Sequence, residues 1–178
     1  GCMAIDRQKT ETVHWHAVFT ASRAEKKVRD RLEELGVESF LPVQTVLRQW
    51  TYRKSRVVVP VIAGLVFVRV SRQEQVKVLQ TKGVVAFLRL KGEAGAAVIP
   101  DKQMEDFRFL LDFSEEAVEM TNENIKAGDL VRVVKGSLRG MEGELIRHKG
   151  VTKVLVRIDM LGCAMVNIPA SFVEKLNK

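Results

Sequence analysis

The pattern of apolar and polar positions divides residues 1–112 into strands and helices. A period of two, as in residues 14–20, predicts a strand whose alternate side chains lie on opposite faces. A period near 3.6, as in residues 25–35, predicts an amphipathic helix. Helices packed around a mostly antiparallel sheet give the fold class α+β, with an N-terminal α/β sandwich. The same reasoning predicts strands over 60–70 and 84–90, an extended stretch over 37–43, a hairpin over 45–59 with its tip near 52–55, and helices after Ser71 and from Pro100.

Two of the predicted helices begin at a capping box. Ser22 stands three residues before Glu25, and Ser71 stands three residues before Glu74. In this arrangement the serine hydroxyl accepts a hydrogen bond from the first turn, and the carboxylate accepts one from the backbone N–H of the serine. Both boxes are therefore predicted to fix the first turn of a helix.

Short apolar runs and glycines alternate in the last third of the chain. The glycines suit tight turns, because glycine adopts positive φ at little cost. Several short strands at close spacing predict a small five-stranded β-barrel. The predicted strands cover 130–133, a run that begins at Leu145, 153–158, 165–168 and 172–175, and Cys163 falls in a predicted turn between two of them.

Charge divides the chain, whose net charge is +7, into three parts. Residues 1–112 carry a net charge of +6 and residues 125–178 one of +5, whereas residues 113–124 contain four glutamates and no Lys or Arg. We therefore predict two domains, 1–112 and 125–178, joined by an acidic linker over 113–124 that forms no element of its own. Two basic domains favour a polyanionic partner; the alternative is that the charge only keeps the protein soluble.

Composition and motifs exclude several classes of protein. Cys2 and Cys163 form neither a disulfide framework nor a metal spacing, which suits a reduced cytoplasm. No apolar run reaches 18 residues, so no membrane span is expected. His14 and His16 would share one face of a strand without further ligands nearby, so we expect neither a metal nor another cofactor. No P-loop and no nucleophile–histidine arrangement is visible, so we expect no enzyme, and we expect a monomer.

The residues that surround the tip of the predicted hairpin are rich in cations and aromatic rings. Cations neutralise phosphate groups, and aromatic rings stack on unpaired bases, so this segment is a candidate nucleic-acid-binding site. The alternative is a solvated hairpin whose aromatic side chains pack on the sheet. Its candidate residues are Arg48, Trp50, Tyr52, Arg53, Lys54 and Arg56, and a second candidate patch consists of Arg23, Lys26 and Lys27.

Several segments together carry a resemblance to a known family. The pattern of residues 126–147 resembles a KOW motif, with Gly128, Gly136, Gly140 and Gly143 as its glycines. An NGN domain, a linker and a KOW domain in this order resemble the NusG family of transcription factors, including its specialised RfaH-type paralogues. The segments that resemble the NGN domain are Trp15 in the first strand, the helix around Glu25 and Lys26, Phe40-Leu41-Pro42, the run over 60–68, and Lys82-Gly83-Val84.

The resemblance implies a non-catalytic elongation or antitermination factor. NGN domains of this family dock an apolar patch on the clamp helices of RNA polymerase, bridge the cleft and suppress pausing. By position, Phe19, Leu65 and Phe67 would form that patch; the alternative is that they belong to the core. The basic residues would then lie near non-template DNA or nascent RNA. The KOW domain would hold a second protein, such as a ribosomal protein or Rho.

A second class of function also fits the sequence. A KOW barrel with a basic surface is compatible with an RNA-binding or ribosome-associated protein. Co-purification distinguishes the two classes, because one predicts polymerase subunits and the other ribosomal subunits.

Overall fold

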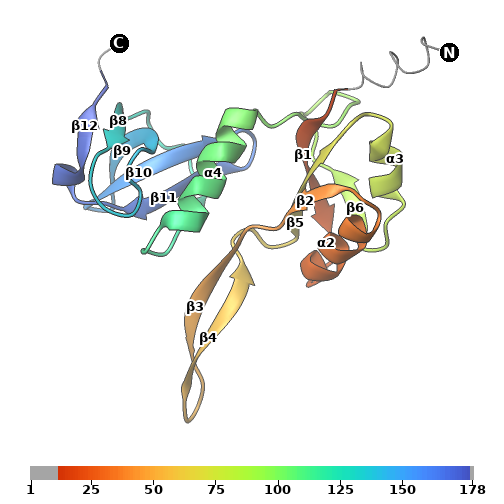
Figure 1. The fold of residues 1–178 in the computed structure, drawn as a ribbon, viewed down its shortest axis with the longest axis horizontal. Coiled ribbons are helices and arrows are strands. Elements are labelled where there is room, and N and C mark those ends of the chain that lie inside the picture. Colours follow the sequence, from red (N-terminus) through yellow and green to blue (C-terminus); the bar gives the residue numbers. More distant parts are fainter. Residues whose placement is uncertain (1–11, 177–178) are drawn as a thin grey trace. The chain divides into compact units, whose positions relative to one another are not determined.

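The computed structural model describes residues 12–176, which divide into two compact units (Figure 1). The first unit contains residues up to 41 together with residues 63–101. The second contains residues 42–62 together with residues from 102 onward. The predicted domains, 1–112 and 125–178, have other bounds than these two units, and they stay a prediction. Cys2 lies outside the described residues.

The first unit is built on a four-stranded antiparallel sheet with the order β2-β5-β1-β6. Its two central strands, β1 (His14–Thr20) and β5 (Leu65–Val70), are buried on both faces along most of their length, and Ala17, Val18 and Phe67 are fully buried. The mixed α/β architecture with an antiparallel sheet agrees with the predicted fold class. The remaining elements of this unit are α2 (Glu25–Glu34), β2 (Glu38–Phe40), α3 (Glu74–Leu79) and β6 (Val84–Phe87).

Only one of the two predicted capping boxes is present. Ser71 N–H donates to Glu74 Oε1 at 3.0 Å, and Glu74 N–H donates to Ser71 Oγ at 3.3 Å, just ahead of α3. The box at Ser22 was a wrong prediction, because no side chain caps α2. Glu25 instead accepts a hydrogen bond from the distant Gly64 N–H.

The second unit contains a two-stranded ribbon, a helix and a six-stranded antiparallel sheet of order β12-β8-β9-β10-β11-β7. The ribbon consists of β3 (Val43–Gln49) and β4 (Lys54–Pro60), and the helix is α4 (Asp101–Phe113), with Met104, Phe107 and Leu110 buried as its period predicts. The sheet consists of β7 (Glu119–Thr121), β8 (Asp129–Val133), β9 (Glu142–His148), β10 (Val151–Ile158), β11 (Gly162–Asn167) and, after a short 3₁₀ turn (Ala170–Phe172), β12 (Val173–Lys175).

Several predicted bounds and placements differ from the structure. The strand predicted over 60–70 begins only at Leu65, because Pro60 ends β4 and residues 61–64 turn the chain. The hairpin turns at residues 50–53, where Trp50 N–H donates to the Arg53 carbonyl at 2.6 Å. The predicted linker contains β7, which pairs with β11. Cys163 lies buried within β11 rather than in a turn.

Candidate functional surfaces

The three residues predicted to form an apolar patch differ in their exposure. Phe19 is 39% exposed, but Leu65 and Phe67 are only 1% and 0% exposed. The register places all three on the same face of the sheet, because Leu65 pairs with Phe19 and Phe67 pairs with Ala17. Phe67 stacks on Phe40, with ring centroids 6.1 Å apart. Placing Leu65 and Phe67 on a contact surface was therefore wrong, and they are core residues in this structure.

The exposed Phe19 lies at the end of β1, where the backbone is tightly fixed. Thr20 N–H donates to the Gly64 carbonyl at 2.9 Å, and Gly64 N–H donates to Glu25 Oε2 at 2.8 Å. Gly64 has a φ of +71°, a conformation in which side chains are strained. Glu25 is the buried first residue of α2, so its carboxylate ties the turn before β5 to the helix, while the Thr20–Gly64 bond ties that turn to the end of β1. The Glu25–Gly64 contact joins residues 39 positions apart, and no local signal predicts it.

The ribbon of β3 and β4 exposes the candidate residues of the hairpin. Trp50 is 49% exposed and Tyr52 is 97% exposed, so neither aromatic side chain packs on a sheet as the alternative assumed. The indole N–H of Trp50 donates to Ser55 Oγ at 2.5 Å, which holds this ring along the ribbon. All four cations, Arg48, Arg53, Lys54 and Arg56, are exposed.

The ribbon is joined at its base to the segment that precedes β7. Gln44 Nε2 donates to the Val118 carbonyl at 3.1 Å, and Val118 N–H donates to Gln44 Oε1 at 3.0 Å. One amide side chain thus satisfies both backbone groups of Val118, as a neighbouring strand would. Sequence reasoning did not find this contact, because it spans 74 positions.

The second candidate patch lies at the start of α2. Arg23, Lys26 and Lys27 are exposed, and Arg23 has a φ of +60°, so the chain turns sharply just before the helix. Cations oppose the positive end of a helix dipole. Their position is thus compatible with a role outside the helix.

The two histidines of β1 differ in environment. His14 is exposed, whereas His16 is buried, contacts the ring edge of Phe87 and places Nδ1 2.8 Å from the Ala97 carbonyl. Burial lowers the pKa of His16, although the hydrogen bond to Ala97 opposes this effect. Within residues 12–176 there is no group of three His, Cys, Asp or Glu arranged to hold a metal ion. No helix in that range is long and apolar enough to cross a membrane.

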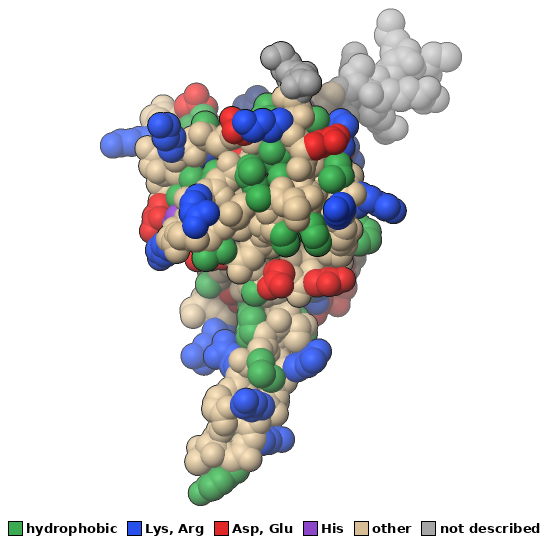
Figure 2. Space-filling view, turned by 90° about the vertical axis from the view of Figure 1, so that its left-hand side faces the viewer, with side chains coloured by type: hydrophobic (Ala, Val, Ile, Leu, Met, Phe, Trp, Pro, Cys, Tyr) green, Lys and Arg blue, Asp and Glu red, His purple; other side chains and the backbone are tan. Residues whose placement is uncertain are grey.

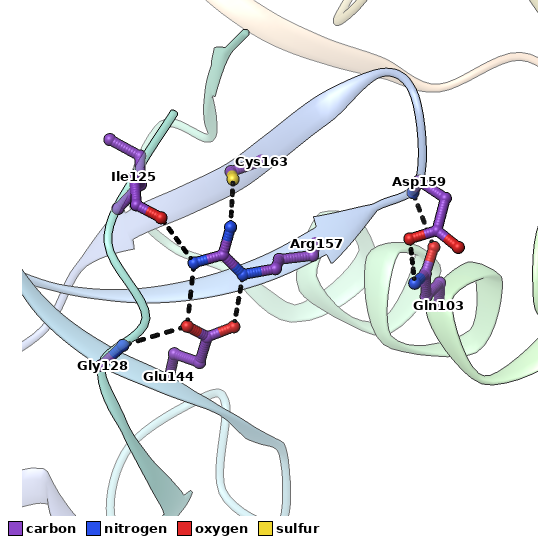
Figure 3. A network of polar contacts seen from close by, with 7 residues as sticks. All are labelled: Gln103, Ile125, Gly128, Glu144, Arg157, Asp159 and Cys163. Carbon is purple, nitrogen blue, oxygen red and sulfur yellow. Dashed lines mark hydrogen bonds and ion pairs between the residues drawn. The ribbon is translucent and has the colours of Figure 1, made fainter. Parts of the chain in front are cut away.

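A polar network lies on the β9–β10–β11 part of the second sheet (Figure 3). Arg157 donates to both oxygens of Glu144, at 2.7 and 3.0 Å, and to the Ile125 carbonyl at 2.8 Å. Gly128 N–H donates to the same Glu144 carboxylate at 3.1 Å. Burial raises the pKa of Glu144, but the hydrogen bonds from Arg157 and Gly128 outweigh it and leave the pKa below its usual range. The network fixes the irregular segment between β7 and β8 against the sheet.

Two of the predicted motif glycines have clear structural reasons. A Cβ at Gly128 would come within 2.1 Å of the Leu145 carbonyl oxygen, so only glycine fits there. Gly140 has a φ of +97°, in the turn between β8 and β9. These backbone requirements explain why the segment has glycine at both positions.

Comparisons with known proteins place this architecture in a family. A family model described as transcription termination factor NusG matches residues 13–108. A solved structure of Thermotoga maritima NusG is similar over 93% of this chain and 98% of that chain, with 23% sequence identity and a TM-score of 0.50. An MjSpt4:Spt5 complex is similar over 92% of this chain and 97% of that chain, with 18% identity and a TM-score of 0.28. No curated protein matches the chain. Because the family model covers more than half of the sequence, the chain belongs to the NusG family of transcription factors.

Proposed function

We propose that this protein is a non-catalytic transcription elongation factor that binds RNA polymerase through its N-terminal unit and suppresses pausing or termination. The observation that carries the proposal is the match of the NusG family model to residues 13–108, which include the helices and strands from β1 to β6.

The polymerase contact is centred on Phe19. Its side chain is the exposed member of the three residues predicted for this role, and the Glu25–Gly64–Thr20 bonds hold its strand end rigid. A large aromatic side chain on a rigid support suits an interface anchor, because little conformational entropy is lost on binding. The coiled-coil clamp helices that the family resemblance implies would present an apolar face to such an anchor.

The basic residues of the ribbon and of the α2 start supply contacts to nucleic acid beside the polymerase. All seven cations, Arg23, Lys26, Lys27, Arg48, Arg53, Lys54 and Arg56, are exposed. Exposed cations that approach phosphates release condensed counterions, which makes binding stronger at low salt.

The sheet from β7 to β12 corresponds to the proposed KOW domain. Its strand–turn–strand segment from β8 to β9 carries Gly136 and Gly140, both with positive φ, where the motif was predicted. In this proposal it recruits a second protein, such as a ribosomal protein or Rho, while the first unit holds polymerase.

Affinity purification of the tagged full-length protein from its own cells tests the proposal. Recovery of RNA polymerase subunits, reduced in a Phe19→Ala variant, is the expected result. Recovery of ribosomal subunits without polymerase would contradict it and favour a ribosome-associated protein. A Val85→Ala variant is the matched control, since Val85 is also an exposed apolar residue of the same sheet.

A further inference from the structure

The ribbon of β3 and β4 differs from the other β-structure of the chain in charge and burial. Between residues 43 and 60 there are four Lys or Arg and no Asp or Glu. None of these 18 residues is buried. Figure 2 shows Lys and Arg side chains on both sides of the narrow lower arm of the molecule. Within residues 12–176, none of the four ribbon cations forms a salt bridge.

The register places these cations on both faces of the ribbon. Arg48 pairs with Ser55, whereas Arg56 pairs with Leu47 and Lys54 with Gln49. Paired residues share a face and successive residues alternate. Arg48 therefore lies on one face, and Lys54 and Arg56 lie on the other.

Cations on both faces indicate a ligand that has negative charge on two sides. A ribbon that lay flat on one strand or one surface would use a single face and leave the cations of the other in water. A duplex groove instead offers a phosphate backbone along each wall. The major groove of B-form DNA, about 12 Å wide, admits a two-stranded β-ribbon, whereas the minor groove, about 6 Å wide, is too narrow.

The distances along the ribbon also match the depth of this groove. The major groove is about 8.5 Å deep, and a strand rises about 3.3 Å per residue. Lys54 lies two positions after Tyr52, and Arg48 lies three positions before Thr51. When the tip reaches the groove floor, Lys54 and Arg48 stand roughly 7–10 Å above it, near the height of the phosphates. Arg56, two positions beyond Lys54, stands about 13 Å above the floor, at the outer rim of the wall that Lys54 faces.

We infer that the tip of the β3–β4 ribbon enters the major groove of double-helical DNA, with Arg48 toward one phosphate wall and Lys54 and Arg56 toward the other. Tyr52, which is 97% exposed at the tip, then reaches the base edges. Trp50 is tied to Ser55 and supports the ribbon. A-form RNA is a poor ligand, because its major groove is deep and narrow. This inference rests on the proposed nucleic-acid contact and adds the form of nucleic acid and the groove.

Binding of the full-length protein to a fluorescent 20-base-pair DNA duplex, measured by anisotropy over a series of salt concentrations, tests the inference. Each lost phosphate contact should reduce the log–log salt slope by about 0.9. Arg48→Ala should thus reduce it by about 0.9, and Lys54→Ala with Arg56→Ala by about 1.8. Lys77→Ala with Lys82→Ala, an equal change of exposed charge in the first unit, should leave the slope unchanged.

The groove is tested with modified ligands. A duplex whose cytosines carry bulky glucosyl groups in the major groove should bind at least tenfold more weakly, whereas prior occupation of the minor groove by netropsin should have no effect. An unchanged slope for Arg48→Ala would show that only one face binds and would overturn the inference. Equal affinity for single-stranded DNA or for an RNA duplex would overturn it too, but would leave the proposed nucleic-acid contact standing. Polymerase capture by the same variants is measured in parallel, so that loss of duplex binding and loss of polymerase binding are told apart.

Discussion

The β3–β4 ribbon and the β7–β12 sheet are both antiparallel β-structure in the same unit, but their cationic side chains differ in whether they have carboxylate partners. In the strands of the sheet, most cations have carboxylate partners: Arg157 binds Glu144, Lys153 binds Glu119 and Lys175 binds Asp129. The ribbon carries four cations without a single carboxylate. Val154 and Leu155 in the sheet are fully buried, whereas no ribbon residue is. Charges that are satisfied internally contribute to the fold, and charges left unsatisfied on an exposed ribbon are available to a ligand.

The largest expected effect comes from breaking the network of the sheet. Glu144→Ala should lower the free energy of unfolding by about 2 kcal/mol, because it leaves the partly buried Arg157 guanidinium without its bidentate partner. Chemical denaturation measures the loss. Glu142→Ala is the control, since its pair with Arg132 is 43–46% exposed and should contribute less than about 0.5 kcal/mol. Equal losses of unfolding free energy in both variants would show that the network contributes no more than an exposed ion pair.

The next largest effect concerns the hydrogen bonds that join the base of the ribbon, at Gln44, to Val118 just before β7. Gln44→Ala should lower the free energy of unfolding by about 1 kcal/mol, because the partly buried Val118 N–H and carbonyl lose their partner. Amide hydrogen exchange at Val118 should accelerate. Gln49→Ala, which removes an exposed amide from the same strand, should leave that exchange rate unchanged. Unaltered protection in Gln44→Ala would mean that the ribbon base is held by other contacts.

A third prediction uses pH to separate the first unit from the network of the second. The pKa of His16 is lowered by burial, so its neutral form stabilises the fold fully above about pH 6.5. That contribution is lost as the pH falls below 6.5, because the unfolded chain then binds the proton more readily. Stability should decline between pH 7 and pH 5, and His16→Asn should decline less. Glu144 stays ionised in this window because its pKa is lowered, so a Glu144 variant with the same decline as wild type supports the assignment.

The smallest effect on stability belongs to the ribbon. Lys54→Ala with Arg56→Ala should change the free energy of unfolding by less than about 0.5 kcal/mol, because both side chains are exposed and unpaired. The same variant should reduce the log–log salt slope of duplex binding by about 1.8. Stability is measured by thermal denaturation. A loss of stability close to that of Glu144→Ala would show that the ribbon cations contribute to the fold as the network of the sheet does.

The local sequence pattern predicts an element correctly where its structure depends on near neighbours in the sequence. The period of residues 14–20 gives the bounds of β1, and the spacing of Met104, Phe107 and Leu110 gives the buried face of α4. The Ser71–Glu74 box is present because its bonds join residues three apart. Each of these features depends on neighbours in the sequence.

Long-range contacts determine the features that the local sequence pattern did not predict. Glu25 leaves the predicted capping box because Gly64 offers it a backbone N–H. The three residues of β7 carry no strand pattern and become a strand by pairing with β11. The burial of Leu65 and Phe67 follows from a sheet covered on both faces, whereas alternation alone could not tell a core face from a contact face.

The most direct test of the proposed function is the affinity of purified RNA polymerase for the wild-type protein and for Phe19→Ala, measured side by side. Loss of an aromatic anchor at an interface costs on the order of 2 kcal/mol or more, which corresponds to a decrease in affinity of about 30-fold. Circular dichroism should show an unchanged fold, since Phe19 is 39% exposed. A decrease of this size is the predicted result. Failure of the wild-type protein to bind polymerase, or equal binding by a folded Phe19→Ala variant, would contradict the account.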